Sequence, residues 1–192
     1  PQLTGDVPRA GYAYPAAAVK DAVSIPVAAS NRINDPSEAE KVLALGEADL
    51  VNLGRALLAD PDFPRKAEAG DAPLIRRCVA CTQGCLARTF FAQPAGCILN
   101  GYAGRECEHL MHRTREPKNI LVLGAGVAGC EFAIQAAVRG NNVTIWEKSQ
   151  EIGGQLHLVA APHAKREFLT LIDYYRSMLA RLSIQVLYGK DA

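Results

Sequence analysis

Two short apolar stretches separated by an amphipathic one form the clearest pattern in the first third of the chain. Residues 24–33 (SIPVAASNRI) and 48–53 (ADLVNL) have the composition of buried strands. Between them, residues 35–38 (DPSE) supply a helix N-cap, a proline at the first helical position and an acid at the third, and Gly46 supplies a stop. This strand, helix, strand order predicts a parallel sheet in a barrel or a doubly wound fold.

Polar residues follow each predicted strand. Asn31 and Arg32 follow the first strand, and Gly54 and Arg55 follow the second. In a barrel, ligands bind at the C-terminal ends of strands, and phosphate commonly binds at the loops after the seventh and eighth. If these are those strands, each pair offers backbone N–H groups and a guanidinium to a phosphate. The alternative is that both arginines form ordinary ion pairs at the barrel rim.

Regular periodicity returns at residues 119–148, which read as strand, glycine turn, helix and strand. Gly124, Gly126 and Gly129 match the GxGxxG pattern, and Glu147 ends the second strand. In this context the pattern predicts a dinucleotide site, with the pyrophosphate at the helix N-terminus and Glu147 on a ribose diol. Glu147 fits either NAD or the adenosine ribose of FAD. The alternative is a tight turn without a ligand.

A polar turn, Gly153-Gly154-Gln155, follows this unit. It is either part of the nucleotide site or a turn alone. Residues 163–182 then predict a helix, with apolar side chains at helical spacing on one face.

Residues 66–117 lack regular periodicity, and four cysteines lie within them in the pattern CxxCxxxC, eleven residues, C. Thiolates bind iron–sulfur clusters, but four of them also suit a closed tetrahedral zinc site, and the spacing alone does not choose. In either case, metal–ligand bonds would offset the loss of chain entropy on folding in a segment that buries few apolar side chains. The candidate ligands are Cys78, Cys81, Cys85 and Cys97.

Two further cysteines are interpreted as bystanders. Cys130 follows Gly129 on the predicted nucleotide-site helix and suits a small buried position. Cys107 forms CxHxxH with His109 and His112, which is a second candidate metal pattern, although the charged residues around it favour a solvated surface.

The composition of the chain argues against some classes of function. The chain has 192 residues, 49% hydrophobic content and a net charge of +1, which gives no basic field for nucleic acid. No apolar run has the length of a membrane span, and the start does not resemble a signal peptide, so a cytoplasmic protein is expected. Because the chain starts at Pro1 and ends just after a strand-like run, it is interpreted as a piece of a longer polypeptide.

Four motifs, PVAASNRINDP, ADLVNLGRALLADPDF, CTQGCL and LVLGAGVAG…EKSQEIGGQL, together resemble iron–sulfur flavoproteins related to old yellow enzyme. More narrowly, the chain resembles the 2,4-dienoyl-CoA reductase and trimethylamine dehydrogenase group of the NADH:flavin oxidoreductase family. It implies an α/β protein with three parts. These are the C-terminal part of an FMN-binding TIM (β/α)8 barrel in residues 1–66, a [4Fe–4S]-binding segment in 67–117, and the start of a Rossmann-like FAD/NAD(P)-binding domain in 118–192.

The resemblance also implies roles for individual residues. It places the four cysteines on the [4Fe–4S] cluster, while the catalytic residues would precede Pro1, so none is assigned here. Asn100-Gly101 departs from the group, in which Asn-Pro is frequent after the fourth Cys. Asn31 departs from many simple old yellow enzymes, which have Gly there, but it matches the reductase-like branch. The implied FMN-phosphate residues are Asn31, Arg32, Gly54 and Arg55. The implied FAD residues are Gly124, Ala125, Gly126, Gly129, Glu147, Gly154 and Gln155.

The implied function is electron transfer from NAD(P)H through FAD, the [4Fe–4S] cluster and FMN to an enoyl or 2,4-dienoyl CoA-type substrate. One alternative is a dehydrogenase of the trimethylamine type, which passes electrons to an acceptor flavoprotein and has ADP in place of FAD. An alternative of another class is a non-catalytic metal-binding or electron-transfer module. The expected partner is a small-molecule substrate, without nucleic acid or a membrane span, and homo-oligomerisation stays open.

Overall fold

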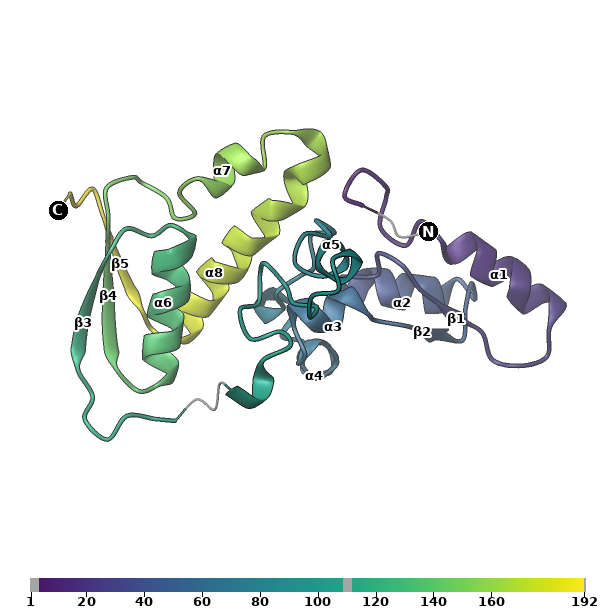
Figure 1. Ribbon diagram of the computed structural model, residues 1–192, viewed down its shortest axis with the longest axis horizontal. Helices are drawn as coiled ribbons and strands as arrows, with labels where there is room; N and C mark the ends of the chain where they lie inside the picture. Colours follow the sequence, from purple (N-terminus) through teal and green to yellow (C-terminus); the bar gives the residue numbers. More distant parts are fainter. Residues whose placement is uncertain (1–3, 109–111, 192) are drawn as a thin grey trace. The chain divides into compact units, whose positions relative to one another are not determined.

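The computed structural model describes residues 4–108 and 112–191, and the chain forms two compact units, Pro1–Glu106 and Cys107–Ala192 (Figure 1). Both units mix helices and strands, as the sequence predicts. The predicted cluster segment, residues 67–117, contributes its part up to Glu106 to the first unit.

The first unit contains the predicted strand, helix, strand order. Strand β1 (Ala28–Ala29) pairs in parallel with β2 (Leu50–Val51), and helix α2 (Pro36–Ala44) connects them. Asp35 caps α2 by accepting a hydrogen bond from the Ser37 N–H at 3.0 Å. Gly46 follows the helix with φ of +70°, so the predicted start and stop signals of α2 are confirmed.

Both strands are shorter than the apolar runs that predicted them. Each pairs only with the other among the described residues, and β1 ends where the chain turns sharply. Asn31 and Arg32 have φ of +74° and +56°, which is incompatible with an extended strand. Apolar composition therefore located the strands correctly and overestimated their length.

Short helices complete this unit. Helix α1 (Ala13–Ala22) precedes β1, and α3 (Arg55–Ala59) and α4 (Phe63–Glu68) follow β2. One group of buried side chains packs between the strands and α2, and a second packs under α3 and α4. The first is Ala13, Ala29, Ile33, Ala39, Val42 and Ala48, and the second is Ala56, Phe63 and Ile75.

The segment that carries the four cysteines has little regular structure, as its lack of periodicity predicts. It holds the 3-10 turns η1 (Ala72–Leu74) and η2 (Glu106–Glu108) and the one-turn helix α5 (Leu86–Phe90). Polar contacts attach it to the rest of its unit. The Arg76 N–H donates to Asp60 at 2.8 Å, and the Asn100 amide donates to the Leu58 carbonyl at 3.0 Å.

The second unit is a three-stranded parallel sheet with the order β3-β4-β5. Helices α6 and α8 lie together on one face of this sheet (Figure 1). The elements are β3 (Asn119–Leu123), α6 (Val127–Val138), β4 (Asn142–Glu147), α7 (Leu156–Val159), η3 (His163–Phe168), α8 (Leu169–Arg181) and β5 (Gln185–Tyr188).

The prediction of the last helix is partly correct. Residues 163–168 form a 3-10 turn, and the α-helix begins at Leu169. Within α8 the predicted apolar face is buried, including Leu171, Ile172 and Tyr175. Across the described residues, none of the helices combines the length and apolar character needed to cross a bilayer.

Candidate functional site

A polar pocket of about 190 Å³ lies where the loops after β1 and β2 meet. Asn31 and Arg32 come from the first loop, and Gly54 and Arg55 come from the second. All four residues predicted to bind a phosphate therefore line one pocket. Parallel strands bring this about, because their carboxyl ends meet at the same edge of a sheet.

The backbone on one side of this pocket is strained. Asn31 and Arg32 are consecutive residues in the left-handed region, with φ of +74° and +56°. Each such residue costs on the order of 1–3 kcal/mol and persists only where the surroundings enforce it. Turns of this kind direct neighbouring N–H groups to one side, which suits an anion. Arg32 is also buried, with 7% of its surface exposed, so this edge of the pocket fits a phosphate.

A second pocket lies beside the first and is lined by all four candidate ligand cysteines, Cys78, Cys81, Cys85 and Cys97. The loop after β2, the CxxCxxxC turn and the segment around Cys97 enclose it. Within residues 4–108 and 112–191, no three His, Cys, Asp or Glu side chains stand where they would hold one metal ion. Four thiolates are a donor set for an iron–sulfur cluster or for a closed tetrahedral zinc site.

Amide groups point at the cysteine sulfurs. The Ala80 N–H donates to the Cys78 Sγ at 3.4 Å. The Leu99 and Asn100 amides hydrogen-bond to Cys97. Hydrogen bonds of this kind stabilise negative charge on sulfur and tune the reduction potential of an iron–sulfur cluster.

Gly84 lets the two cysteine-bearing segments approach each other. A Cβ at this position would lie 2.8 Å from the Ile98 nitrogen and 3.0 Å from the Cys97 Cα. The Gly96 N–H donates to the Gly84 carbonyl at 2.8 Å, which fastens the two segments together. Sequence reasoning missed Gly84, although its place between two candidate ligands, Cys81 and Cys85, was a usable signal.

Burial disfavours the ionised form of two of these thiols, Cys78 and Cys97. It raises the pKa of Cys78 to about 11, while the nearby Arg55 guanidinium opposes that rise. Burial also raises the pKa of Cys97. Bound iron would supply the positive charge that thiolates need in such surroundings.

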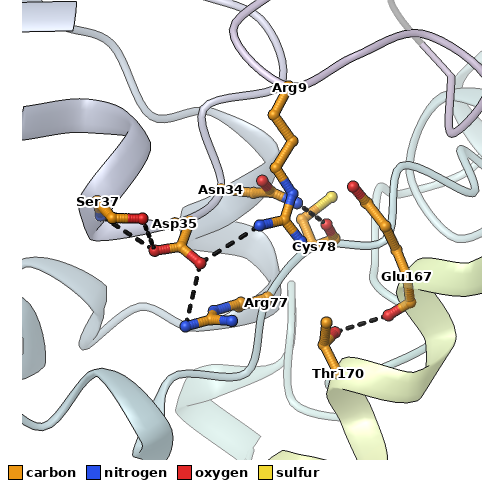
Figure 2. Close-up of polar contacts among 8 residues, drawn as sticks. All are labelled: Arg9, Asn34, Asp35, Ser37, Arg77, Cys78, Glu167 and Thr170. Atoms are coloured by element: carbon orange, nitrogen blue, oxygen red, sulfur yellow. Dashed lines mark hydrogen bonds and ion pairs between the residues drawn. The ribbon is translucent and has the colours of Figure 1, made fainter. Parts of the chain in front are cut away.

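Asp35 links three parts of the first unit through one carboxylate (Figure 2). It caps α2, and its Oδ2 accepts from Arg9 at 3.3 Å and from Arg77 at 3.1 Å. The neighbouring Asn34 amide donates to the carbonyl of Cys78. The sequence predicted the cap but not these long-range contacts, because local spacing does not show which distant arginines will approach.

The glycine turn of the second unit has the geometry that the GxGxxG pattern predicts. Gly124 has φ of +92°, and Gly126 is the N-cap of α6. A Cβ on Gly129 would lie 1.9 Å from the Gly124 carbonyl oxygen, so no larger residue fits there. A Cβ on Gly154 would lie 3.3 Å from the Gly126 Cα, which places the later polar turn against this one.

Glu147 joins the end of β4 to the glycine turn. Its Oε2 accepts from the Ala125 N–H at 2.6 Å, and its Oε1 accepts from the Ser149 N–H at 2.8 Å. The Ser149 backbone hydrogen bond is the main cause that lowers the pKa of Glu147, and the Ala125 bond adds to it, against the opposing effect of burial. Each carboxylate oxygen keeps acceptor capacity for a ribose hydroxyl.

A pocket of about 230 Å³ opens at the ends of β3, β4 and β5. Gly124, Glu147 and Lys148 contribute to it, whereas Gly154 and Gln155 do not line it and are exposed. In open parallel sheets, nucleotides bind outside the carboxyl ends of the strands, where this pocket lies.

The two remaining cysteines differ in environment. Cys130 is fully buried as predicted, and its Sγ donates to the Ala125 carbonyl at 3.3 Å. Burial raises its pKa to about 12, so it is unreactive. Cys107 is exposed. The CxHxxH pattern includes His109, which lies outside the described residues.

Two protein families match separate parts of the chain. Residues 5–72 match the NADH:flavin oxidoreductase / NADH oxidase family. Residues 122–175 match the NAD(P)-binding Rossmann-like domain.

Similar proteins include several reductases. A metal reductase of Desulforamulus reducens is 48% identical over 192 residues, which are 100% of this chain and 29% of that protein. A bilirubin reductase of Mediterraneibacter gnavus is 38% identical over 174 residues, covering 91% of this chain and 27% of that protein. A solved structure of a 2-naphthoyl-CoA reductase with 2-naphthoyl-CoA is 33% identical, with a TM-score of 0.96, over 100% of this chain and 30% of that one. The chain therefore spans less than a third of the length of these relatives.

Proposed function

We propose that the chain is the cofactor-linking part of a flavin and iron–sulfur oxidoreductase, because its residues 5–72 match the NADH:flavin oxidoreductase / NADH oxidase family. Residues 1–66 would complete an FMN-binding TIM barrel, residues 67–117 would bind a [4Fe–4S] cluster, and residues 118–192 would begin an FAD/NAD(P)-binding domain. The observation that carries this proposal is that the four cysteines line one pocket beside the predicted phosphate pocket.

In the first unit, the chain would bind the FMN phosphate through Arg32, Arg55 and the strained Asn31-Arg32 turn. A guanidinium gives a phosphate two parallel charge-assisted hydrogen bonds, and the backbone N–H groups add fixed donors. Gly54, which precedes α3, has no atom within 4 Å of a built Cβ and leaves open space beside the phosphate.

The cluster would be held by Cys78, Cys81, Cys85 and Cys97. Apolar neighbours, including Leu58 and Leu99, would exclude water from it, and amide-to-sulfur hydrogen bonds would stabilise its charge. In the second unit, the N-terminus of α6 would bind a pyrophosphate, with Glu147 on the adenosine ribose. Ala125 would contribute through its backbone, because its N–H donates a hydrogen bond to the Glu147 carboxylate and so holds that carboxylate in place.

When bound, these groups would supply a path for electrons from NAD(P)H through FAD, the cluster and FMN to a conjugated carbon–carbon double bond. The substrate class is an enoyl or 2,4-dienoyl compound, of which a CoA thioester is one form. The names of the bilirubin and 2-naphthoyl-CoA reductases support reduction of conjugated systems as the chemistry.

Cofactor analysis of the anaerobically purified full-length protein tests this proposal. We expect FMN, FAD, iron and acid-labile sulfide together, with about four iron atoms per chain. We also expect NADH or NADPH to bleach the flavin absorbance and an enoyl-CoA to restore it. FMN with ADP in place of FAD would favour the amine dehydrogenase alternative, and protein without flavin would contradict the proposal.

A further inference from the structure

Arg55 lies between the two pockets of the first unit. It is the first residue of α3, directly after Gly54. Of the residues that line the phosphate pocket and those that line the cysteine pocket, only Arg55 and Cys78 are common to both. Arg55 is therefore a charged residue that borders both the predicted phosphate position and the predicted cluster position.

The charge of Arg55 acts in weakly polar surroundings. The cysteine pocket is lined mainly by sulfur and apolar groups, including Leu58, Val79 and Leu99. A guanidinium stays protonated at any ordinary pH, and Coulomb interactions are less screened where apolar groups replace water.

We propose that Arg55 couples the two sites: its charge raises the reduction potential of the cluster, and a phosphate bound to its guanidinium weakens that effect. A cluster that accepts an electron becomes more negative, so a fixed cation beside it favours the reduced form. This inference rests on the proposed function, since it requires that a cluster is present.

Arg32 provides a matched control. It carries the same charge and lines the same phosphate pocket, but it does not line the cysteine pocket. The two arginines should therefore have the same effect on FMN binding and different effects on the cluster.

The test is a potentiometric titration of the cluster, followed by electron paramagnetic resonance, in FMN-depleted full-length protein. At a fixed applied potential, Arg55→Gln should lower the ratio of reduced to oxidised cluster by on the order of tenfold, which is a shift of about 59 mV for a one-electron couple. Arg32→Gln should leave that ratio within about twofold of wild type. Both variants should retain less FMN after gel filtration.

Arg55→Lys separates the two roles, because it keeps the charge but lacks the planar fork. It should retain less FMN while the cluster ratio stays near that of wild type. Equal cluster ratios in Arg55→Gln and wild type, with iron and sulfide intact in both, would overturn the inference. Absence of iron and sulfide from wild type would instead overturn the proposed function.

If Arg55→Gln does not retain the cluster, wild type alone still decides the question. Inorganic phosphate, at concentrations that block FMN rebinding, should neutralise the guanidinium and lower the ratio of reduced to oxidised cluster several-fold. An unchanged ratio under those conditions would contradict the inference.

Discussion

Single residues decide whether the two cysteine-bearing segments meet. Gly84 is the clearest case, because the space beside its Cα is occupied by the backbone around Cys97 and Ile98. Glu147 has a comparable role in the second unit, where one carboxylate bonds two backbone N–H groups from different loops. In both places the side chain, or its absence, fixes backbone positions that a cofactor would need.

Gly84→Ala should weaken the cluster site. The added methyl group would lie within 3.0 Å of backbone atoms, which cannot move as a flexible side chain can. Iron and sulfide per chain should fall to less than about half of wild type, since strain of about 1–3 kcal/mol is expected.

Gly101→Ala is the matched control for that change, because nothing lies within 4 Å of a Cβ built there. It should retain iron and sulfide at the wild-type level. Equal cluster content in the Gly84→Ala and Gly101→Ala proteins would contradict the role given to Gly84.

Glu147→Gln should reduce the protection of the glycine turn against hydrogen exchange, and the size of this effect should depend on pH. The pKa of Glu147 is lowered in the folded protein, so its stabilising effect is present above its ordinary pKa of 4.5 and is lost as pH falls through the folded pKa. Hydrogen exchange of peptides covering residues 119–150 should be faster in the variant than in wild type at pH 7.

That difference should shrink as the pH is lowered below 4.5 and through the folded pKa of Glu147, because the wild-type carboxylate then becomes protonated and loses its charge. Exchange rates corrected for intrinsic chemistry provide the comparison. A difference between wild type and variant that stays constant from pH 7 down to the lowest pH at which the protein stays folded would show that the charge of Glu147 does not hold the turn.

At the scale of elements, the local signals were sufficient to locate α2, α6 and the strands beside them. Caps, glycines and apolar periodicity act within a few residues, so the sequence displays them directly. The length of β1 was not predictable in this way, because the left-handed turn at Asn31 and Arg32 depends on tertiary surroundings. The 3-10 turn at residues 163–168 was also not predictable from local signals, because the pattern there predicted an α-helix.

The candidate site was predictable to a similar degree. The motifs located residues that line the predicted phosphate pocket and the cysteine pocket, because loop positions and candidate thiolate ligands have characteristic spacings. They did not predict the contacts of Asp35 with Arg9 and Arg77, which are distant in the chain. They also did not predict that Arg55 lies beside both pockets, since this depends on how the two loops pack.

Substitution of Asp35 would show how far the stability of helix α2 and of the cysteine segment depends on one carboxylate. Burial alone would raise the pKa of Asp35, but hydrogen bonds from Ser37 and the charges of Arg77 and Arg9 lower it overall. Asp35→Ala removes the cap and leaves two cations beside a partly buried site. It should lower the free energy of unfolding by about 1–3 kcal/mol, measured by urea denaturation of the full-length protein.

Asp35→Asn serves as the control, because its amide oxygen still caps the helix while the charge is lost. It should lie between wild type and Asp35→Ala in stability. If both variants unfold at the wild-type urea concentration, the carboxylate does not connect these elements.

At the scale of the whole molecule, the chain forms two α/β units and spans 29% of the length of the metal reductase of Desulforamulus reducens. The predicted phosphate and cysteine pockets both lie in the first unit, so their adjacency is a property of that unit alone. The glycine turn and Glu147 belong to the second. The proposed electron transfer therefore depends above all on whether the four cysteines hold an iron–sulfur cluster.

The most direct measurement is iron and acid-labile sulfide content, with electron paramagnetic resonance after dithionite reduction, in wild-type, Cys97→Ser and Cys107→Ser full-length proteins. Cys97 lines the cysteine pocket, whereas Cys107 is exposed and outside it. The account predicts about four iron and four sulfide per chain in wild type and Cys107→Ser, and a large loss of both in Cys97→Ser. Stoichiometric zinc without sulfide in wild type, or a Cys97→Ser protein with its full iron and sulfide, would contradict it.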